Sequence, residues 1–202
     1  MSATAKKAHV WARHPEQWYV EPGSVTRQLL TVERFAGPVL DPCCGQGNIV
    51  TTMIEHGVQA RGMDLVRRVE QGTPWFIGES DFLAGPVAAS FPNLVFNPPF
   101  FRAKGAEAFI RHAIGQASAK VAAFVDIRFI TGAERANGLF AEHTPHRIWI
   151  VTPRVSCPPG EYLAAGNEAK GGTADWCWLV YDVTAPPVAV SQVGWLRRPA
   201  HG

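Results

Sequence analysis

The sequence lacks long hydrophobic runs, has few cysteines and carries little net charge. Its 202 residues are 47% hydrophobic and 18% charged, with a formal net charge of +2. No apolar stretch approaches the roughly 20 residues of a membrane-spanning helix. Lys6 and Lys7 have no continuous apolar segment behind them, so we also expect no secretory signal. Because the apolar fraction is too high for a disordered chain, the composition indicates a globular protein with a buried core.

The cysteines and histidines lack the spacing of metal ligands. Four cysteines stand at positions 43, 44, 157 and 177, with no C-x-x-C pair among them, which excludes a typical zinc site or disulfide framework. The seven histidines show no metal-ligand spacing either, so we predict no metal and a reducing, cytoplasmic location. A pI of about 8.4 is only mildly basic and decides neither for nor against a nucleic-acid partner.

Strand-like and helix-like segments alternate along the chain. Hydrophobic patterning predicts strands at residues 38–41, 60–65, 75–78, 94–96, 121–127, 148–151 and 176–183. It predicts helices at residues 48–56, 103–119 and 131–142, and irregular chain with at most a short edge strand after residue 185. No repeat or Gly/Ser linker divides the sequence, so we expect a partly ordered arm over residues 1–18 and one domain over residues 19–202.

This alternation indicates an α/β fold with a mostly parallel sheet and helices on both faces. The last two predicted strands are separated by irregular chain and should pair antiparallel. In an open sheet of this kind, ligands bind beyond the carboxyl ends of the strands. The residues at those ends are therefore the candidate site.

Acidic residues follow three successive predicted strands. Asp41 opens the loop Asp-Pro-Cys-Cys-Gly-Gln-Gly, in which Gly45 and Gly47 let the backbone approach a flat ligand. The loop is neither a P-loop nor a G-x-G-x-x-G dinucleotide motif, and a turn without a ligand remains an alternative. Asp64 ends the second strand, where a carboxylate can accept hydrogen bonds from ribose hydroxyls. The pair Asp81-Phe82 can bind an adenine amino group and cover its ring, although each aspartate alone is often a helix cap.

The most specific motif is Asn97-Pro98-Pro99-Phe100, at the end of the fourth predicted strand. The prolines make it rigid and remove two backbone donors while leaving carbonyl acceptors. The side-chain oxygen of Asn97 and a proline carbonyl can then hold both hydrogens of a planar amino group, while Phe100 stacks on the ring that carries it. The alternative, a Pro-Pro loop that merely ends the strand, does not account for the acidic residues upstream.

Together these residues resemble the S-adenosylmethionine-dependent amino-methyltransferases, whose fourth strand ends in N/D-P-P-F/Y/W, over about residues 19–183. The resemblance implies a Rossmann-like sheet of seven strands whose last strand is inserted antiparallel. It implies that S-adenosylmethionine is bound by Asp41, Pro42, Gly45, Gly47, Asp64, Asp81, Phe82 and Asn97, with Asp64 at the ribose and the Asp81-Phe82 pair at the adenine. The catalytic motif would be Asn97, Pro98, Pro99 and Phe100.

The segment around Glu21 and Pro22 is similar to the amino-terminal motif of members in which all other motifs follow it. There it closes over the methionine carboxylate, which implies that Glu21 and Pro22 bind the cofactor. The Asp-Pro-Cys-Cys-Gly loop and the small size are similar to phage- and prophage-type DNA adenine methyltransferases. Relatives often carry an aromatic wall for the target base where this chain has Cys157, so Tyr162 or Phe101 would have to replace it.

The resemblance implies direct methyl transfer to an exocyclic amino nitrogen, in the first place N6 of adenine in DNA. A nucleophilic Cys43 or Cys157 is not expected, because Cys43 lies in the cofactor loop and Cys157 precedes its prolines. An RNA methyltransferase acting on adenine N6 or guanine N2, a protein glutamine methyltransferase and a degenerate partner subunit remain alternatives.

A DNA adenine would have to leave the base stack to be methylated. The chain offers no separate target-recognition domain for this. Candidate phosphate contacts are Arg102, Lys104, Arg128, Arg135, Arg147 and Arg154.

Overall fold

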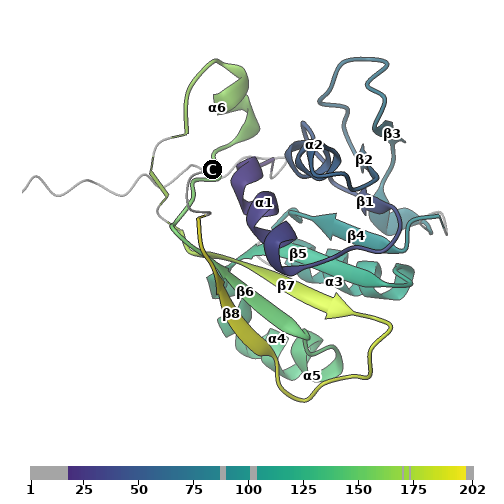
Figure 1. The fold of residues 1–202 in the computed structure, drawn as a ribbon, viewed down its shortest axis with the longest axis vertical. Helices are drawn as coiled ribbons and strands as arrows, with labels where there is room; N and C mark the ends of the chain where they lie inside the picture. Colours follow the sequence, from purple (N-terminus) through teal and green to yellow (C-terminus); the bar gives the residue numbers. More distant parts are fainter. Residues whose placement is uncertain (1–17, 87–89, 101–103, 170, 173, 199–202) are drawn as a thin grey trace, which may run out of the picture.

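The computed structural model describes residues 18–198 except 87–89, 101–103, 170 and 173, so most of the expected arm, Phe101 and Arg102 lie outside the described residues. Eight strands form one sheet in the order β3-β2-β1-β4-β5-β7-β6-β8 (Figure 1). They are β1 (Val39–Asp41), β2 (Ala60–Asp64), β3 (Phe76–Glu79), β4 (Asn93–Phe96), β5 (Lys120–Asp126), β6 (Arg147–Val151), β7 (Trp176–Asp182) and β8 (Gln192–Leu196).

The sheet is parallel from β3 to β5 and changes direction at β7. β2 pairs in parallel with β3 and β1, β1 with β4, and β4 with β5, whereas β7 runs antiparallel between β5 and β6. The predicted mostly parallel sheet and the antiparallel pairing of β6 with β7 are confirmed. β8 is parallel to β6, and it makes an eighth strand where the resemblance implied seven. It lies in the stretch after residue 185, where the sequence predicted at most a short edge strand.

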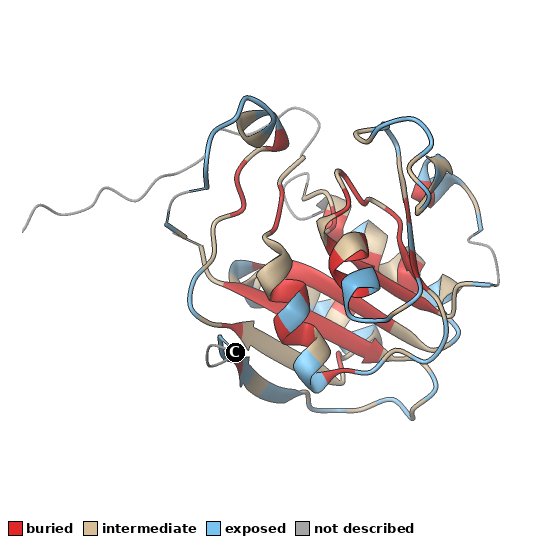
Figure 2. Ribbon diagram, turned by 45° about the horizontal axis from the view of Figure 1, so that its top comes forward, coloured by how far each residue is buried: buried red, intermediate tan, exposed pale blue. Residues whose placement is uncertain are grey.

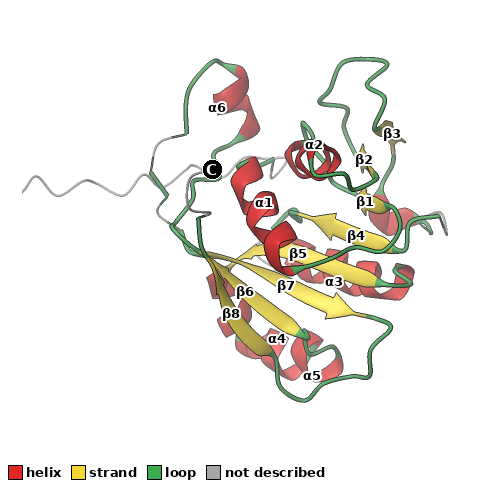
Figure 3. Cartoon of the chain, viewed as in Figure 1, coloured by secondary structure: helices red, strands yellow, loops and turns green. Residues whose placement is uncertain are grey.

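Helices cover both faces of the sheet, as predicted. α1 (Gly23–Val32) and α2 (Asn48–Glu55) lie on one face, and α3 (Lys104–Gln116), α4 (Ala133–Asn137) and α5 (Leu139–Glu142) lie on the other (Figures 1 and 3). α6 (Gly160–Ala164) stands apart from the sheet (Figure 1). Of the helices that the structure describes, none combines the length and the apolar character of a membrane span.

The prediction of a single helix over residues 131–142 is wrong. A 3₁₀ helix at Ile127–Thr131 comes first, and Gly138 then separates α4 from α5. The backbone of Gly138, at φ −111° and ψ −97°, is outside the helical region. The apolar spacing that suggested one helix is therefore distributed over three short pieces.

The core has two layers because successive residues of a strand point to opposite faces. In β5, Ala122 and Phe124 pack into the layer beneath α1 and α2, while Val121, Ala123 and Val125 pack into the layer beneath α3. Figure 2 shows that the central strands are buried along most of their length. This double burial explains why β5 reads as a continuous apolar run in the sequence.

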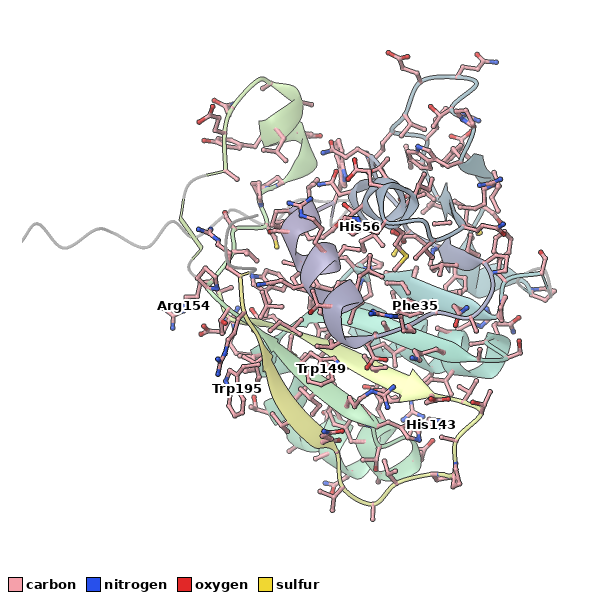
Figure 4. All side chains as sticks on the ribbon, viewed as in Figure 1. Phe35, His56, His143, Trp149, Arg154 and Trp195 are labelled. Carbon is pink, nitrogen blue, oxygen red and sulfur yellow. The ribbon has the colours of Figure 1, made fainter. Side chains whose placement is uncertain are left out.

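A buried ion-pair cluster joins α1 to the sheet. Glu33, the residue after α1, is 3% exposed. Its carboxylate accepts hydrogen bonds from Lys120 Nζ at 2.7 Å, from Trp149 Nε1 at 2.9 Å and from the guanidinium of Arg147. Figure 4 labels Trp149, a residue of β6, just below the end of α1. The cluster lies at the amino ends of β5 and β6, so it secures the edge of the sheet opposite to the strand ends that carry the predicted site.

The segment before α1 is joined to the loop before α6. Val20 N donates to the carbonyl of Pro158 at 2.9 Å, and Gly160 N donates to the carbonyl of Trp18 at 3.0 Å. A Cβ at Gly160 would lie 2.0 Å from the indole of Trp18, so this close approach requires glycine. These contacts hold residues 18–21 beside the carboxyl ends of β1 and β4.

Candidate functional site

A cavity of about 400 Å³ lies at the carboxyl ends of β1, β2 and β4. Eight of the ten predicted cofactor residues line it: Glu21, Asp41, Pro42, Gly45, Asp64, Asp81, Phe82 and Asn97. Pro99 of the predicted catalytic motif also lies in its wall. Pro22, Gly47, Pro98 and Phe100 are not among the lining residues. The strand-end rule therefore brings most of the predicted residues together, because parallel strands share one carboxyl edge.

Asp64 organises the floor of the cavity. Its Oδ2 accepts a hydrogen bond from Gly45 N at 2.7 Å, and its Oδ1 accepts one from Val66 N at 3.2 Å. Each carboxylate oxygen has two lone pairs, so Asp64 can hold the β1–α2 loop and still accept hydrogen bonds from a ligand. The carboxylate has both a structural role and free acceptor capacity facing the cavity.

Gly47 shapes this loop from outside the cavity. It has φ +90° and precedes α2, and a Cβ there would lie 2.2 Å from the ring of Trp75. Pro22 likewise serves structure, because it precedes α1 and its carbonyl accepts a hydrogen bond from Val25 N at 3.1 Å. Both residues support the walls that Gly45 and Glu21 form.

The predicted adenine contacts, Asp81 and Phe82, lie in the wall of the cavity. Asp81 Oδ1 accepts a hydrogen bond from Leu83 N at 2.9 Å and so caps the short 3₁₀ helix Phe82–Ala84. Phe82 is buried, and its ring lies 5.1 Å from the ring of Phe109 on α3. The capping role considered from the sequence is thus real, and it keeps both side chains at the cavity wall.

Acidic side chains give the cavity its electrostatic character. Glu21 and Asp41 are both buried. Burial raises the pKa of Glu21 to about 7, although the hydrogen bond from Asn97 opposes the increase. Burial, together with the nearby charge of Glu21, raises the pKa of Asp41 well above its usual value. A ligand that carries positive charge would relieve this repulsion.

Asn97 is fixed at the end of β4. Its Nδ2 donates to Glu21 Oε2 at 2.8 Å and to the carbonyl of Tyr19 at 3.2 Å. The thiol of Cys43 donates to the Asn97 carbonyl at 3.2 Å. Oδ1 of Asn97 is buried and has no hydrogen-bond partner among the described residues. A buried acceptor without a partner carries a desolvation cost.

The cysteines act as packing and donor groups. Burial, reinforced by the charge of Asp41, raises the pKa of the Cys43 thiol, so it stays protonated and donates to Asn97. Cys44 is buried against Gly62, where a Cβ would lie 2.7 Å from it. Cys157 is also buried, and burial raises its pKa. None of these three environments produces a reactive thiolate.

Phe100 packs beside the cavity rather than in its wall. Its ring lies 6.2 Å from that of Trp176 in an edge-on arrangement, and Trp176 in turn stacks on Phe124 at 5.0 Å. Tyr162, considered as a second aromatic wall, lies on α6 and is not a lining residue. The position of a stacked base therefore stays a prediction.

Most of the predicted phosphate contacts are engaged within the protein. Arg128 pairs with Asp126, and Arg154 pairs with Asp175 at 2.6 Å; Figure 4 places Arg154 at the margin of the molecule, away from β2 and β3. Arg147 binds Glu33 at the opposite edge of the sheet. For Arg147 the prediction is wrong, because β6 runs parallel to β5 and its first residue faces away from the site.

Two further candidates lie in α3 and α4. Arg135 donates to the Phe129 carbonyl at 2.6 Å and lies over its ring. Lys104 is the first residue of α3.

Three residues in the wall of the cavity were not among the residues predicted from the sequence. Trp18, Arg68 and Asn48 also line the cavity. The guanidinium of Arg68 lies 4.2 Å from the centre of the Trp18 ring, and Asn48 Nδ2 donates to the Glu21 carbonyl at 2.7 Å. The position of Asn48 at the start of the predicted helix after the glycine loop was a usable signal, but nothing in the sequence connects Trp18 with Arg68. Within the described part of the chain, no group of three metal-binding side chains is found.

Comparison with known proteins gives matches in structure alone. No family model matches the sequence, and no curated protein matches it. A Listeria monocytogenes protein provisionally named a class I S-adenosylmethionine-dependent methyltransferase is 14% identical, with a TM-score of 0.59, over 94% of this chain and 68% of that one. A Vibrio vulnificus protein provisionally named the modification subunit of a type I restriction enzyme is 14% identical, with a TM-score of 0.60, over 89% of this chain and 46% of that one.

A third match, a Lactococcus lactis protein provisionally named a hemolysin, is 10% identical, with a TM-score of 0.56, over 89% of this chain and 93% of that one. The chain thus spans less than half of the Vibrio subunit. At these identities the likeness concerns the fold. The parallel half-sheet, the helices on both faces and the inserted antiparallel β7 show that this chain has the class I S-adenosylmethionine-dependent methyltransferase fold.

Proposed function

We propose that the protein is an S-adenosylmethionine-dependent methyltransferase that modifies an exocyclic amino group, with N6 of adenine in DNA as the favoured target. The observation that carries the proposal is the buried, unpartnered Oδ1 of Asn97, a residue in the wall of the cavity that Asp64 and Asp81 also line. A hydrogen-bond donor of the substrate would satisfy this acceptor, and an amino group supplies one.

The residues of the cavity fit S-adenosylmethionine. Its sulfonium and ammonium groups are cationic, and Asp41, buried in the wall of the cavity, would favour a cationic ligand when it is ionised. Asp64 retains acceptor capacity for ribose hydroxyls, and Asp81 with Phe82 would hold the adenine. When bound, the cofactor supplies an electrophilic methyl group.

The chain's contribution to transfer is to position the amine. Asn97 Oδ1 accepts one amine hydrogen and the Pro98 carbonyl accepts the other, which turns the nitrogen lone pair away from conjugation with the ring. The same acceptors stabilise the positive charge that develops on nitrogen, and the proton then leaves to solvent. Phe100 provides an aromatic surface near this point. No covalent intermediate is needed, and the raised pKa of Cys43 is consistent with its absence.

A nucleic acid is the favoured substrate class. The Asn-Pro-Pro-Phe motif resembles that of the amino-methyltransferases that act on adenine, and the fold is shared with a protein provisionally named a restriction-modification subunit. The Asp-Pro-Cys-Cys-Gly loop is similar to that of the phage- and prophage-type DNA enzymes. RNA and protein glutamine are the competing substrates, and a partner subunit without activity is the non-enzymatic alternative.

Transfer of a labelled methyl group tests the proposal. The protein is incubated with S-adenosylmethionine tritiated in its methyl group and with separate pools of DNA, RNA and protein, and nuclease digestion identifies the modified base. We expect label in DNA as N6-methyladenine. Label only in protein would overturn the nucleic-acid assignment. Absence of S-adenosylmethionine binding in calorimetry at high protein concentration would favour the inactive subunit.

Two asparagine variants test the site. Asn97→Ala should reduce turnover by roughly two orders of magnitude while S-adenosylmethionine affinity, measured by calorimetry, changes little. Asn137→Ala, an exposed asparagine at the end of α4, is the matched control and should leave both unchanged. Full turnover in the Asn97 variant would refute the assignment of this residue.

A further inference from the structure

Glu21 makes a side-chain contact that the sequence resemblance did not imply, the hydrogen bond from Asn97. We infer that Glu21 is a positioning residue that fixes the side-chain amide of Asn97 with its oxygen toward the target amine. This inference rests on the proposed function. It assigns Glu21 to the amine end of the site rather than to the carboxylate of the cofactor.

The hydrogen bonds of Asn97 determine the orientation of its amide. An amide nitrogen has two hydrogens, and in Asn97 they face Glu21 Oε2 at 2.8 Å and the Tyr19 carbonyl at 3.2 Å. The Tyr19 carbonyl can only accept a hydrogen bond, and the Glu21 carboxylate, when ionised, can only accept as well. The reversed orientation would place Oδ1 against two oxygens and would lose a charge-assisted hydrogen bond. Oδ1 must therefore point elsewhere, and it is buried without a hydrogen-bond partner among the described residues.

Glu21 is itself held in place by contacts on both sides. Its carbonyl accepts a hydrogen bond from Asn48 Nδ2 at 2.7 Å, and the preceding residue, Val20, is bonded to Pro158 at 2.9 Å. The residue is 7% exposed. Because the backbone of Glu21 is held in place, its carboxylate can hold the side chain of Asn97. The amino-terminal segment therefore sets the geometry of a residue 76 positions later in the sequence.

The charges around Glu21 argue against its binding a ligand carboxylate. The charge of Glu21 acts on Asp41 and on the thiols of Cys43 and Cys157. Its side-chain hydrogen bond goes to Asn97. Another anion in this position would meet the buried carboxyl groups of Glu21 and Asp41. An amide donor is the partner that the site provides, and the negative charge also strengthens Asn97 Oδ1 as an acceptor.

Two substitutions at Glu21 separate positioning from cofactor binding. Glu21→Gln keeps an acceptor oxygen for Asn97 Nδ2, whereas Glu21→Ala removes it. We expect Glu21→Ala to lower kcat by about ten- to a hundredfold, the equivalent of one charge-assisted hydrogen bond, with S-adenosylmethionine affinity within about threefold by calorimetry. Glu21→Gln should recover most of kcat. Full kcat in Glu21→Ala, or a loss of cofactor affinity that accounts for the whole effect, would overturn the inference.

A spectroscopic measurement on the protein without cofactor or substrate supplies an independent readout. The Asn97 side-chain amide resonances, identified by their absence in Asn97→Ala, should shift with pH around the Glu21 pKa of about 7. They should stop shifting in Glu21→Gln. Titration that persists in Glu21→Gln would contradict direct contact.

The two hypotheses fail in different ways. A wild-type protein that methylates none of the substrate pools refutes the proposed function. An active enzyme whose kcat ignores Glu21→Ala refutes the positioning role alone.

Discussion

The substitution Gly47→Ala should show how strongly the wall of the cavity depends on one close contact. Gly47 has φ +90° at the start of α2, and a Cβ there would lie 2.2 Å from the Trp75 ring. Gly57, after α2, is a matched control because it has φ +77° and nothing within 4 Å of its hypothetical Cβ. The two substitutions share the same conformational cost and differ in the steric one.

The expected magnitudes follow from these two geometries. A left-handed conformation costs a non-glycine residue about 1–2 kcal/mol, and this is the whole expected loss for Gly57→Ala. Overpacking typically adds about 1–3 kcal/mol, so Gly47→Ala should lose about 2–5 kcal/mol of the free energy of unfolding. For a chain of this size, that corresponds to a decrease in Tm of roughly 5–15 °C.

Urea unfolding of both variants, together with thermal melts, measures the difference. Truncation of the neighbour in the double variant Gly47→Ala with Trp75→Ala should recover part of the loss relative to the sum of the single variants. S-adenosylmethionine affinity should fall in Gly47→Ala and stay unchanged in Gly57→Ala, because Gly47 supports the loop that lines the cavity. Equal losses of stability in the two glycine variants would refute the steric argument.

Three further predictions concern titratable groups. Glu33→Gln should lose about 3 kcal/mol and lower Tm, because three buried donors lose their anionic partner; Glu142→Gln, which breaks an exposed ion pair, should change Tm much less. Burial raises the pKa of Glu33, but its three hydrogen bonds more than offset this and keep the pKa below its usual value. Its stabilisation is therefore present at neutral pH and is lost as pH falls, so the urea midpoints of wild type and Glu33→Gln should converge in acid. A gap that stays constant with pH would contradict this. Glu21 has the opposite sign: with a pKa raised to about 7, its ionisation destabilises the fold as pH rises through 7, and Glu21→Gln should remove that part of the pH dependence. Cys43 should react slowly with an alkylating reagent at neutral pH, because its thiol pKa is raised; rapid alkylation of the folded protein, detected by mass spectrometry, would be inconsistent with this.

The sequence was sufficient for the general fold and for the convergence of the strand-end residues. Asp41, Asp64 and Asn97 are far apart in sequence, but each ends a parallel strand, and the topology of such sheets places those ends along one edge. The same reasoning failed for Arg147. Arg147 begins its strand, but the sequence does not tell at which edge of the sheet that strand begins until the direction of the strand is known.

The contacts between distant segments could not be derived from local patterns. The hydrogen bond from Asn97 to Glu21 and the packing of Trp18 on Gly160 depend on how an irregular segment crosses the sheet edge. Periodicity carries no information about such a path. β8 illustrates the same limit, since its exposed residues alternate poorly and its neighbouring prolines favour an irregular reading.

The position of β7 has a consequence for how the chain is made. β7 is among the last strands in the sequence, yet it lies between β5 and β6 in the interior of the sheet. During synthesis on the ribosome, β6 therefore has no neighbour on the β5 side until Asp182 has emerged. A polypeptide interrupted before that residue leaves a gap in the middle of its architecture, whereas one interrupted just after it loses only the border strand β8.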